Sequence, residues 1–197
     1  MKLQERLPNG VKVGKRFYQL DFDFRNVLKM LEVLQRDDLI DDAREYLAVK
    51  CLTKHPRNVS KVLAAVRELL FETTPSKDGK KVTSFEQDAG LIRTAFRQEY
   101  GIDLFTAKLH WLAFIELLNN IPDGSRYADV IGIRVRPIPK PTKYNQEERE
   151  WLMKAKADVA LHLTEAEAAK KYDEDVQNIF KGLMAFIEKG GGNDNAE

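Results

Sequence analysis

Most apolar side chains recur three or four residues apart, which is the spacing of a helix with one buried face. This pattern predicts helices over residues 24–36, 40–52 and 58–72. Asp23 precedes the first of these and is suited to the N-cap position. Pro56 ends the second helix, because the residue before a proline disfavours helical dihedral angles. The first half of the chain is therefore expected to be mainly helical.

One segment near the N-terminus alternates instead. In residues 11–20 (VKVGKRFYQL), two valines alternate with polar residues before Gly14, and two aromatic residues follow it. This pattern around a short glycine-containing turn predicts a β-hairpin. The preceding stretch, residues 7–10 (LPNG), is predicted to form a turn that leads into the hairpin.

Two capping signals mark helices in the middle of the chain. A capping box, S-F-E-Q, begins at Ser84 and predicts a helix that runs to about Tyr100. Gly101 suits the left-handed position that commonly follows a helix end. Asp103 is expected to cap the next helix, residues 104–119, which is apolar over more than half of its circumference. We expect this helix to lie at the centre of the core.

Residues 126–136 (RYADVIGIRVR) fit two patterns. Ser125 is suited to cap a short helix that includes Tyr127 and Val130, whereas the apolar residues of I-G-I-R-V alternate as in a strand. We favour a short helix that unwinds near Arg134, with the strand as the alternative.

Three prolines in the run R-P-I-P-K-P-T predict an extended, stiff linker. Capping patterns at Asn145 and Thr164 then predict one helix to about residue 161 and another to about residue 189. The expected fold class is mainly α, a multi-helix bundle with a small N-terminal β-hairpin and a C-terminal helical arm. The expected divisions are a hairpin and helical core domain over 1–136, a linker over 137–143, the arm over 144–189 and a disordered tail over 190–197.

The last predicted helix carries an apolar stripe that follows three consecutive acidic residues. One interpretation is that the stripe packs on the main core. The other is that the arm reaches a groove on a neighbouring copy or on a partner protein. On the second interpretation, the candidate partner-binding or self-association residues are Val176, Ile179, Phe180, Leu183 and Ile187.

The charge is balanced overall and strongly divided locally. The 197 residues carry a formal net charge of +1 and are 43% hydrophobic, which suits a chain with a real core. The sign of the charge nonetheless changes along the chain: residues 1–20 and 46–82 are basic, whereas residues 21–45 and 144–197 are acidic. The balance excludes a broad basic surface for nucleic acid. The division favours either solvated faces or copies that attract one another.

The side chains that carry most enzyme chemistry are scarce. The single cysteine, Cys51, excludes an internal disulfide and lies on an apolar helical face. The three histidines lack partners at metal-ligand spacing, and the chain has no glycine-rich phosphate loop. We therefore expect no catalytic, metal-binding or cofactor-binding residues and no enzyme activity. The absence of a long apolar run and of a signal segment predicts a cytoplasmic protein that binds no membrane.

Several stretches together resemble a known family. They are FYQLDFDFRNVLKMLEVL after the hairpin, FEQDAGLIRTAFRQEYGIDL, LHWLAFIELLNNIPDGS and VIGIRVRPIPK, in that order over about residues 7–160. The chain is similar in these stretches to the tail-assembly proteins of long-tailed bacteriophages and of prophages in Gram-positive hosts. The positions that carry the resemblance are Asp88, Phe96, Tyr100, Gly101, Asp103, His110, Trp111, Phe114 and Arg134, and we expect them to be structural.

The resemblance implies a non-enzymatic tail assembly chaperone. Proteins of this kind associate with the tape measure protein and with tail-tube subunits, and they are expected to be helical and to self-associate. One alternative is a structural component that stays in the finished virion. A second alternative is a DNA-binding regulator, because the helices predicted over residues 84–119 superficially resemble a helix-turn-helix.

Overall fold

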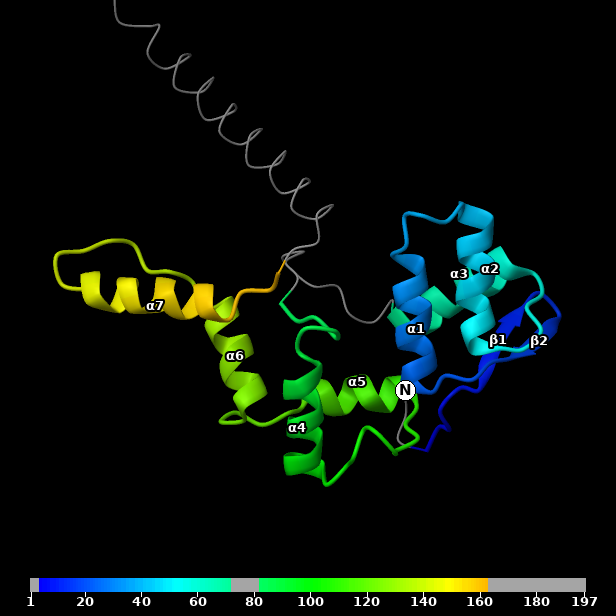
Figure 1. Cartoon of the computed structure of the whole chain (residues 1–197). Coiled ribbons are helices and arrows are strands. Elements are labelled where there is room, and N and C mark those ends of the chain that lie inside the picture. The colour runs from blue at the N-terminus through cyan, green and yellow to red at the C-terminus, as the bar shows by residue number, and fades with distance from the viewer. Residues whose placement is uncertain (1–3, 72–81, 163–197) are drawn as a thin grey trace, which may run out of the picture. The chain divides into compact units, whose positions relative to one another are not determined.

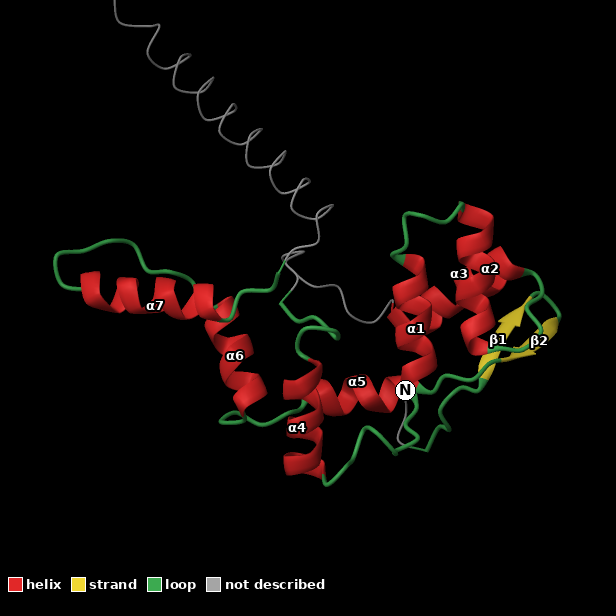
Figure 2. Cartoon of the chain, in the orientation of Figure 1, coloured by secondary structure: helices red, strands yellow, loops and turns green. Residues whose placement is uncertain are grey.

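The computed structural model describes residues 4–71 and 82–162, in which seven helices follow one β-hairpin (Figures 1 and 2). The elements are β1 (Gly10–Val13), β2 (Arg16–Gln19), α1 (Phe24–Leu34), α2 (Asp41–Leu52), α3 (Val59–Phe71), α4 (Ala89–Tyr100), α5 (Trp111–Asn119), α6 (Arg126–Val135) and α7 (Gln146–Asp158). The chain divides into two units, Met1–Val159 and Ala160–Glu197, and every one of these elements lies in the first. The predicted fold class, mainly α with an N-terminal hairpin, is confirmed.

The hairpin forms where the alternating pattern predicts it. Strands β1 and β2 pair antiparallel, with Val11 opposite Tyr18. Gly10 is required there, because a Cβ atom at this position would lie 2.1 Å from the carbonyl oxygen of Tyr18. The turn predicted over residues 7–10 is wrong. The Leu20 N–H donates to the Asn9 carbonyl over 2.9 Å, so strand-like pairing extends beyond the start of β1 and the end of β2.

The first three helices lie within two residues of their predicted bounds. The Asp23 side chain caps α1 by accepting a hydrogen bond from the Arg25 N–H over 3.0 Å, as predicted. The apolar faces of α1, α2 and α3 are buried, with Val27 and Val66 fully inaccessible to solvent. Residues at helical spacing therefore pack these helices against one another and against the hairpin.

Helix α4 begins later than the capping box predicts. The Ser84 hydroxyl accepts a hydrogen bond from the Gln87 N–H, as a capping box requires, but residues 85–88 form only a turn. The Ser84 N–H donates to the Asp88 carboxylate over 2.9 Å, so this tight turn precedes the regular helix at Ala89. The helix ends as predicted, with Gly101 in the left-handed conformation at φ 64°.

The prediction of a helix over residues 104–119 is wrong in its first half, because α5 begins at Trp111. Asp103 does cap one turn, accepting the Phe105 N–H over 3.0 Å. The chain then becomes extended: the Phe24 N–H donates to the Leu109 carbonyl, and the Trp111 N–H donates to the Phe22 carbonyl over 2.7 Å. This pairing uses backbone groups that a continuous helix would need for itself.

The interval between α4 and α5 also bears on the helix-turn-helix alternative. It comprises residues 101–110 and contains an isolated antiparallel bridge between Asp23 and His110. A helix-turn-helix joins its helices by a turn of three or four residues. The arrangement of α4 and α5 is therefore a different one.

Residues 126–135 form the short helix that we favoured for this segment. The Ser125 hydroxyl caps α6 by accepting a hydrogen bond from the Ala128 N–H over 3.1 Å. Helix α7 forms as well, but Asn145 does not cap it. The Asn145 side chain instead accepts from the Thr142 N–H and donates to the Lys140 carbonyl. The helix predicted from Thr164 lies outside the described residues.

The centre of the core is aromatic, and α5 supplies it, as expected. The ring of Phe114 stacks on Phe24 and Phe96 with centroid distances of 4.9 and 5.2 Å. It also packs near Trp111 and Phe85. Phe114 therefore joins α1, α4 and α5 in one cluster that contributes both buried area and favourable ring geometry.

Among the helices that the structure describes, none is long and apolar enough to cross a membrane.

Candidate partner-binding surface

Most of the positions that carry the family resemblance lie in the interior. Phe96, Trp111 and Phe114 are between 0 and 3% exposed and belong to the aromatic core. Tyr100 is partly buried, packs edge-on against Phe96, and donates its hydroxyl to the Leu117 carbonyl over 2.8 Å. These contacts join α4 to α5, so they have a structural role.

Gly101 and Asp103 shape the segment after α4. The Gly101 N–H donates to the Arg97 carbonyl, and its positive φ angle turns the chain away from the helix. Asp103 accepts from the Phe105 N–H and pairs with Arg97 over 3.0 Å. The hydrogen bond from Phe105, together with Arg97, lowers the pKa of the Asp103 carboxyl. Both residues fix local backbone geometry.

His110 joins two distant parts of the chain. Its Nδ1 atom accepts from the Leu112 N–H over 3.1 Å, which caps α5. Its Nε2 atom lies 2.8 Å from the Pro8 carbonyl oxygen. With Nδ1 as the acceptor, Nε2 carries the proton and donates to that carbonyl. His110 thus holds the N-terminal segment against the start of α5.

The most polar interior contact joins Asp88, before α4, to Arg134 in α6. The guanidinium donates to both carboxylate oxygens, over 2.7 and 2.9 Å. The Asp88 side chain is 2% exposed and that of Arg134 is 13% exposed. This two-pronged geometry is the strongest form of ion pair, since planar groups share two parallel hydrogen bonds.

The Asp88 carboxylate and the Arg134 guanidinium each make further hydrogen bonds. Asp88 also accepts from the Thr83 hydroxyl and the Ser84 N–H. Arg134 also donates to the Val82 carbonyl over 3.0 Å and to the Val159 carbonyl over 2.6 Å. No buried side-chain nitrogen or oxygen in the described ranges lacks a partner. Such complete pairing offsets the cost of burying two charges.

Two pKa values are shifted around this ion pair. Burial acts to raise the pKa of the Asp88 carboxyl, but the hydrogen bonds from Arg134, Ser84 and Thr83 outweigh it and hold that pKa below its ordinary value. Burial raises the pKa of the nearby Tyr127 hydroxyl, which contacts the Thr83 hydroxyl over 3.2 Å. Asp88 therefore stays ionised at neutral pH.

Helix α7 is joined to α6 by polar contacts more than by apolar ones. The Lys156 ammonium donates to the Arg134 carbonyl over 2.6 Å, and Arg136 pairs with Glu148 over 2.9 Å. Arg149 donates to the Pro139 carbonyl. Leu152 is fully buried, and it is the only buried residue of α7. The contacts of Arg136 and Pro139 hold residues 136–139 against the helix.

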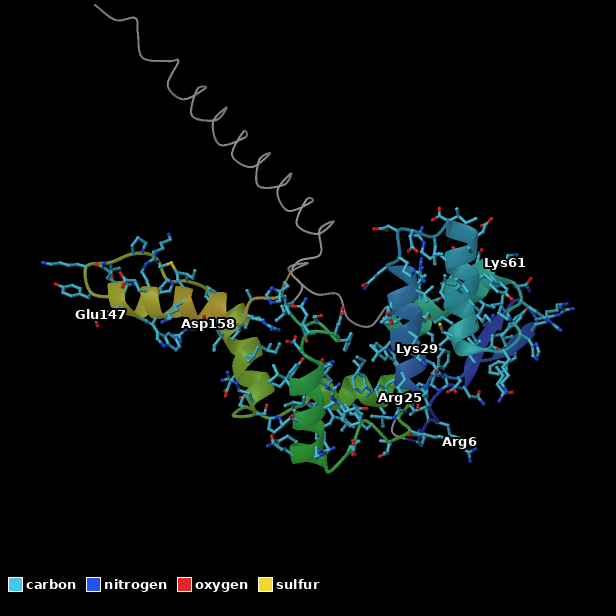
Figure 3. All side chains as sticks on the ribbon, in the orientation of Figure 1. Arg6, Arg25, Lys29, Lys61, Glu147 and Asp158 are labelled. Carbon is cyan, nitrogen blue, oxygen red and sulfur yellow. The ribbon has the colours of Figure 1, made fainter. Side chains whose placement is uncertain are left out.

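Large apolar side chains of this region are exposed to solvent. We define the α6–α7 surface by five such residues, which are Val135, Ile138, Tyr144, Trp151 and Met153. Tyr144 is 92% exposed and Trp151 is 57% exposed. Figure 3 labels Glu147 and Asp158 near the two ends of the helix that carries Trp151. Exposed aromatic residues next to polar ones are typical of protein-binding surfaces.

The residues of the α6–α7 surface are not among those predicted from the sequence to bind a partner. A signal was present in W-L-M at residues 151–153, the only large apolar run in an otherwise polar helix. Only one of these three residues can face inward on a helix, so the others are left to solvent. The predicted partner-binding stripe, from Val176 to Ile187, lies outside the described residues.

Two further side chains that could take part in chemistry are those of Cys51 and His55. Cys51 is partly buried, its thiol donates to the Leu47 carbonyl, and burial raises the pKa of that thiol. His55 is exposed. Within residues 4–71 and 82–162, no group of three or more His, Cys, Asp or Glu residues could hold a metal ion.

Comparison with known proteins identifies a family. The model of the family described as "Bacteriophage Gp15 protein" matches residues 3–161. No curated protein sequence and no solved structure matches the chain.

Proposed function

The chain belongs to the Bacteriophage Gp15 protein family, and from this premise we propose that it is a non-enzymatic tail assembly chaperone. It binds the tape measure protein, and tail-tube subunits, while the phage tail is built in the cytoplasm of the bacterial host. The family match over residues 3–161 is the observation that carries the proposal. The sequence resemblance to tail-assembly proteins supplies the specific role.

The α6–α7 surface supports this role physically. A tape measure protein is a long helical polypeptide, and its apolar stripes would aggregate if they were left in water. A chaperone that covers such stripes needs exposed apolar side chains on a scaffold that stays folded without its partner. Tyr144 and Trp151 are exposed in this way, while Leu152 and the Asp88–Arg134 pair hold the scaffold beneath them.

Co-expression tests the proposal. The tape measure protein of the same phage is expressed alone and together with the full chain, and its soluble fraction is measured. We expect the chain to raise that fraction and to co-purify with it. A soluble fraction that does not rise, with no complex recovered, would contradict the proposal.

Surface variants identify the part of the chain that binds. Tyr144→Ser with Trp151→Ser removes the two most exposed aromatic side chains of the α6–α7 surface without touching Leu152. Ile40→Ser is the matched control, because Ile40 is 76% exposed and lies before α2. We expect the double variant to lose most of the solubilising effect and the control to retain it.

A finished particle provides a further test. A chaperone of this kind acts during assembly, so mass spectrometry of purified virions should find the chain at a small fraction of the abundance of the tail-tube protein. Stoichiometric recovery of the chain from virions would instead favour the structural alternative.

A further inference from the structure

A groove lies between the hairpin, α1 and α3, on elements other than those of the α6–α7 surface. Its volume is about 930 Å³. Val13, Leu31, Leu34, Ala64 and Phe71 contribute apolar side chains to its lining. Ala64 is exposed, and the small alanine side chain leaves room for another chain to approach the helix closely. The groove is therefore an open, largely apolar channel.

The groove is continuous with the aromatic core. Phe71 lines it, and the ring of Phe71 also packs against Trp111 with a centroid distance of 5.8 Å. Trp111 in turn stacks on Phe114. A segment bound in the groove would therefore contact side chains that are held in place from behind, which lowers the entropic cost of binding.

The charged residues that line the groove are mostly basic. They include Lys12 from β1 together with Lys61 and Arg67 from α3, all of them exposed, and Glu68 is the only carboxylate among them. Figure 3 labels Lys61 on its helix. An apolar channel with a basic rim fits an amphipathic helix that carries acidic residues next to its apolar stripe.

The chain contains a sequence of this kind. Residues 173–175 are Asp-Glu-Asp, and the apolar stripe that begins at Val176 and ends at Ile187 follows them directly. We propose that residues 173–187 of a second copy occupy the groove, with the acidic residues at Lys61 and Arg67. A reciprocal exchange fills both grooves of a dimer, so each weak charge contact counts twice.

Charge exchange between two full-length variants tests the proposal. Lys61→Glu with Arg67→Glu reverses the rim, and Asp173→Lys with Asp175→Lys reverses the segment. Sedimentation velocity over a concentration series gives the dissociation constant. We expect the wild type to dimerise and each reversed variant to dimerise about tenfold more weakly, because one to two surface charge pairs are lost per contact. An equimolar mixture of the two variants should recover much of the association.

Two controls separate binding from folding. Lys50→Glu with Lys54→Glu reverses two exposed basic residues that do not line the groove, and it should dimerise as the wild type does. Ala64→Trp fills the groove from an exposed position, so it should keep the circular dichroism spectrum of the wild type and lose dimerisation.

Each contrary result would overturn the proposal. A wild type that stays monomeric, reversed variants that associate as tightly as the wild type, or a mixture that fails to recover would each contradict it. Docking of the segment in the groove of its own chain would leave the sedimentation of every variant unchanged. The proposal can fail while the chaperone role stands, because co-expression depends on Tyr144 and Trp151 and this test does not.

Discussion

The aromatic core and the α6–α7 region are held together by different kinds of contact. Around Phe114, rings from several helices are buried and the stabilisation comes from apolar area and packing. Around Arg134, two charges and several backbone carbonyls are joined by hydrogen bonds, and Leu152 is the only buried residue of α7. Apolar packing is little affected by pH and salt. A polar junction instead loses stability when any one of its hydrogen-bonding groups is lost.

This difference fits the two roles proposed for these regions, folding for the core and partner binding for the α6–α7 region. The core keeps the chain folded in the absence of a partner, while a helix attached mainly by polar contacts can present exposed aromatic residues without burying them. We infer that the α6–α7 region has the lower local stability of the two, since few buried apolar contacts support it.

The largest effect is expected from the core. Phe114→Ala should lower the free energy of unfolding by about 3–5 kcal/mol, because it removes a ring that touches four others and leaves a cavity. Urea unfolding in a Trp151→Phe background measures this loss of stability. Trp111 is then the only tryptophan, so the signal comes from the core. Phe17→Ala, at a ring that is 61% exposed, is the control and should have little effect. A loss below about 1 kcal/mol for Phe114→Ala would mean that the core is not centred on this ring.

The next effect is expected from the polar junction. Asp88→Ala should cost about 3 kcal/mol, because it leaves the Arg134 guanidinium buried without its counter-charge. Arg97→Ala removes an exposed pair with Asp103 and should cost no more than about 1 kcal/mol. Hydrogen exchange should show that Asp88→Ala increases exchange in α6 and α7 more than in α5. Equal increases in all three helices would contradict the distinction between the two regions.

A smaller effect is expected from pH, because protonation of Asp88 leaves its oxygens in place. The pKa of Asp88 is lower in the folded chain than its ordinary value of 3.8, so the folded state binds fewer protons than the unfolded state between these two values. The stabilisation from Asp88 is therefore fully present above about pH 4 and is lost as the pH falls through the folded-state pKa.

Urea unfolding of the wild type and of Asp88→Ala at several pH values tests this sign. The stability difference between the two proteins should be constant near neutral pH and should shrink below about pH 4. A difference that grows as the pH falls would contradict the direction of the shift.

Local patterns predicted much of this fold because they report local physics. Residues close in sequence determine the hairpin, the buried faces of α1 and α3, the Asp23 and Ser125 caps, and the left-handed conformation of Gly101. The start of α5 was predicted wrongly because backbone pairing with residues 22–24 decides it, and nothing near residue 104 signals that pairing.

The candidate site was less predictable for the same reason. Asp88 and Arg134 are 46 residues apart, and neither position looks unusual in its local sequence. The resemblance singled out both residues, but only the structure joins them. The exposure of Trp151 follows from Leu152 facing inward, which depends on how α7 packs rather than on its composition.

Hydrogen exchange of the full chain, alone and in complex with the tape measure protein, tests the central claim most directly. If the α6–α7 surface binds the partner, residues 135–153 should gain protection in the complex, while residues 92–118 of the core should exchange as they do in the free chain. Protection confined to other parts of the chain, with residues 135–153 unchanged, would contradict the account.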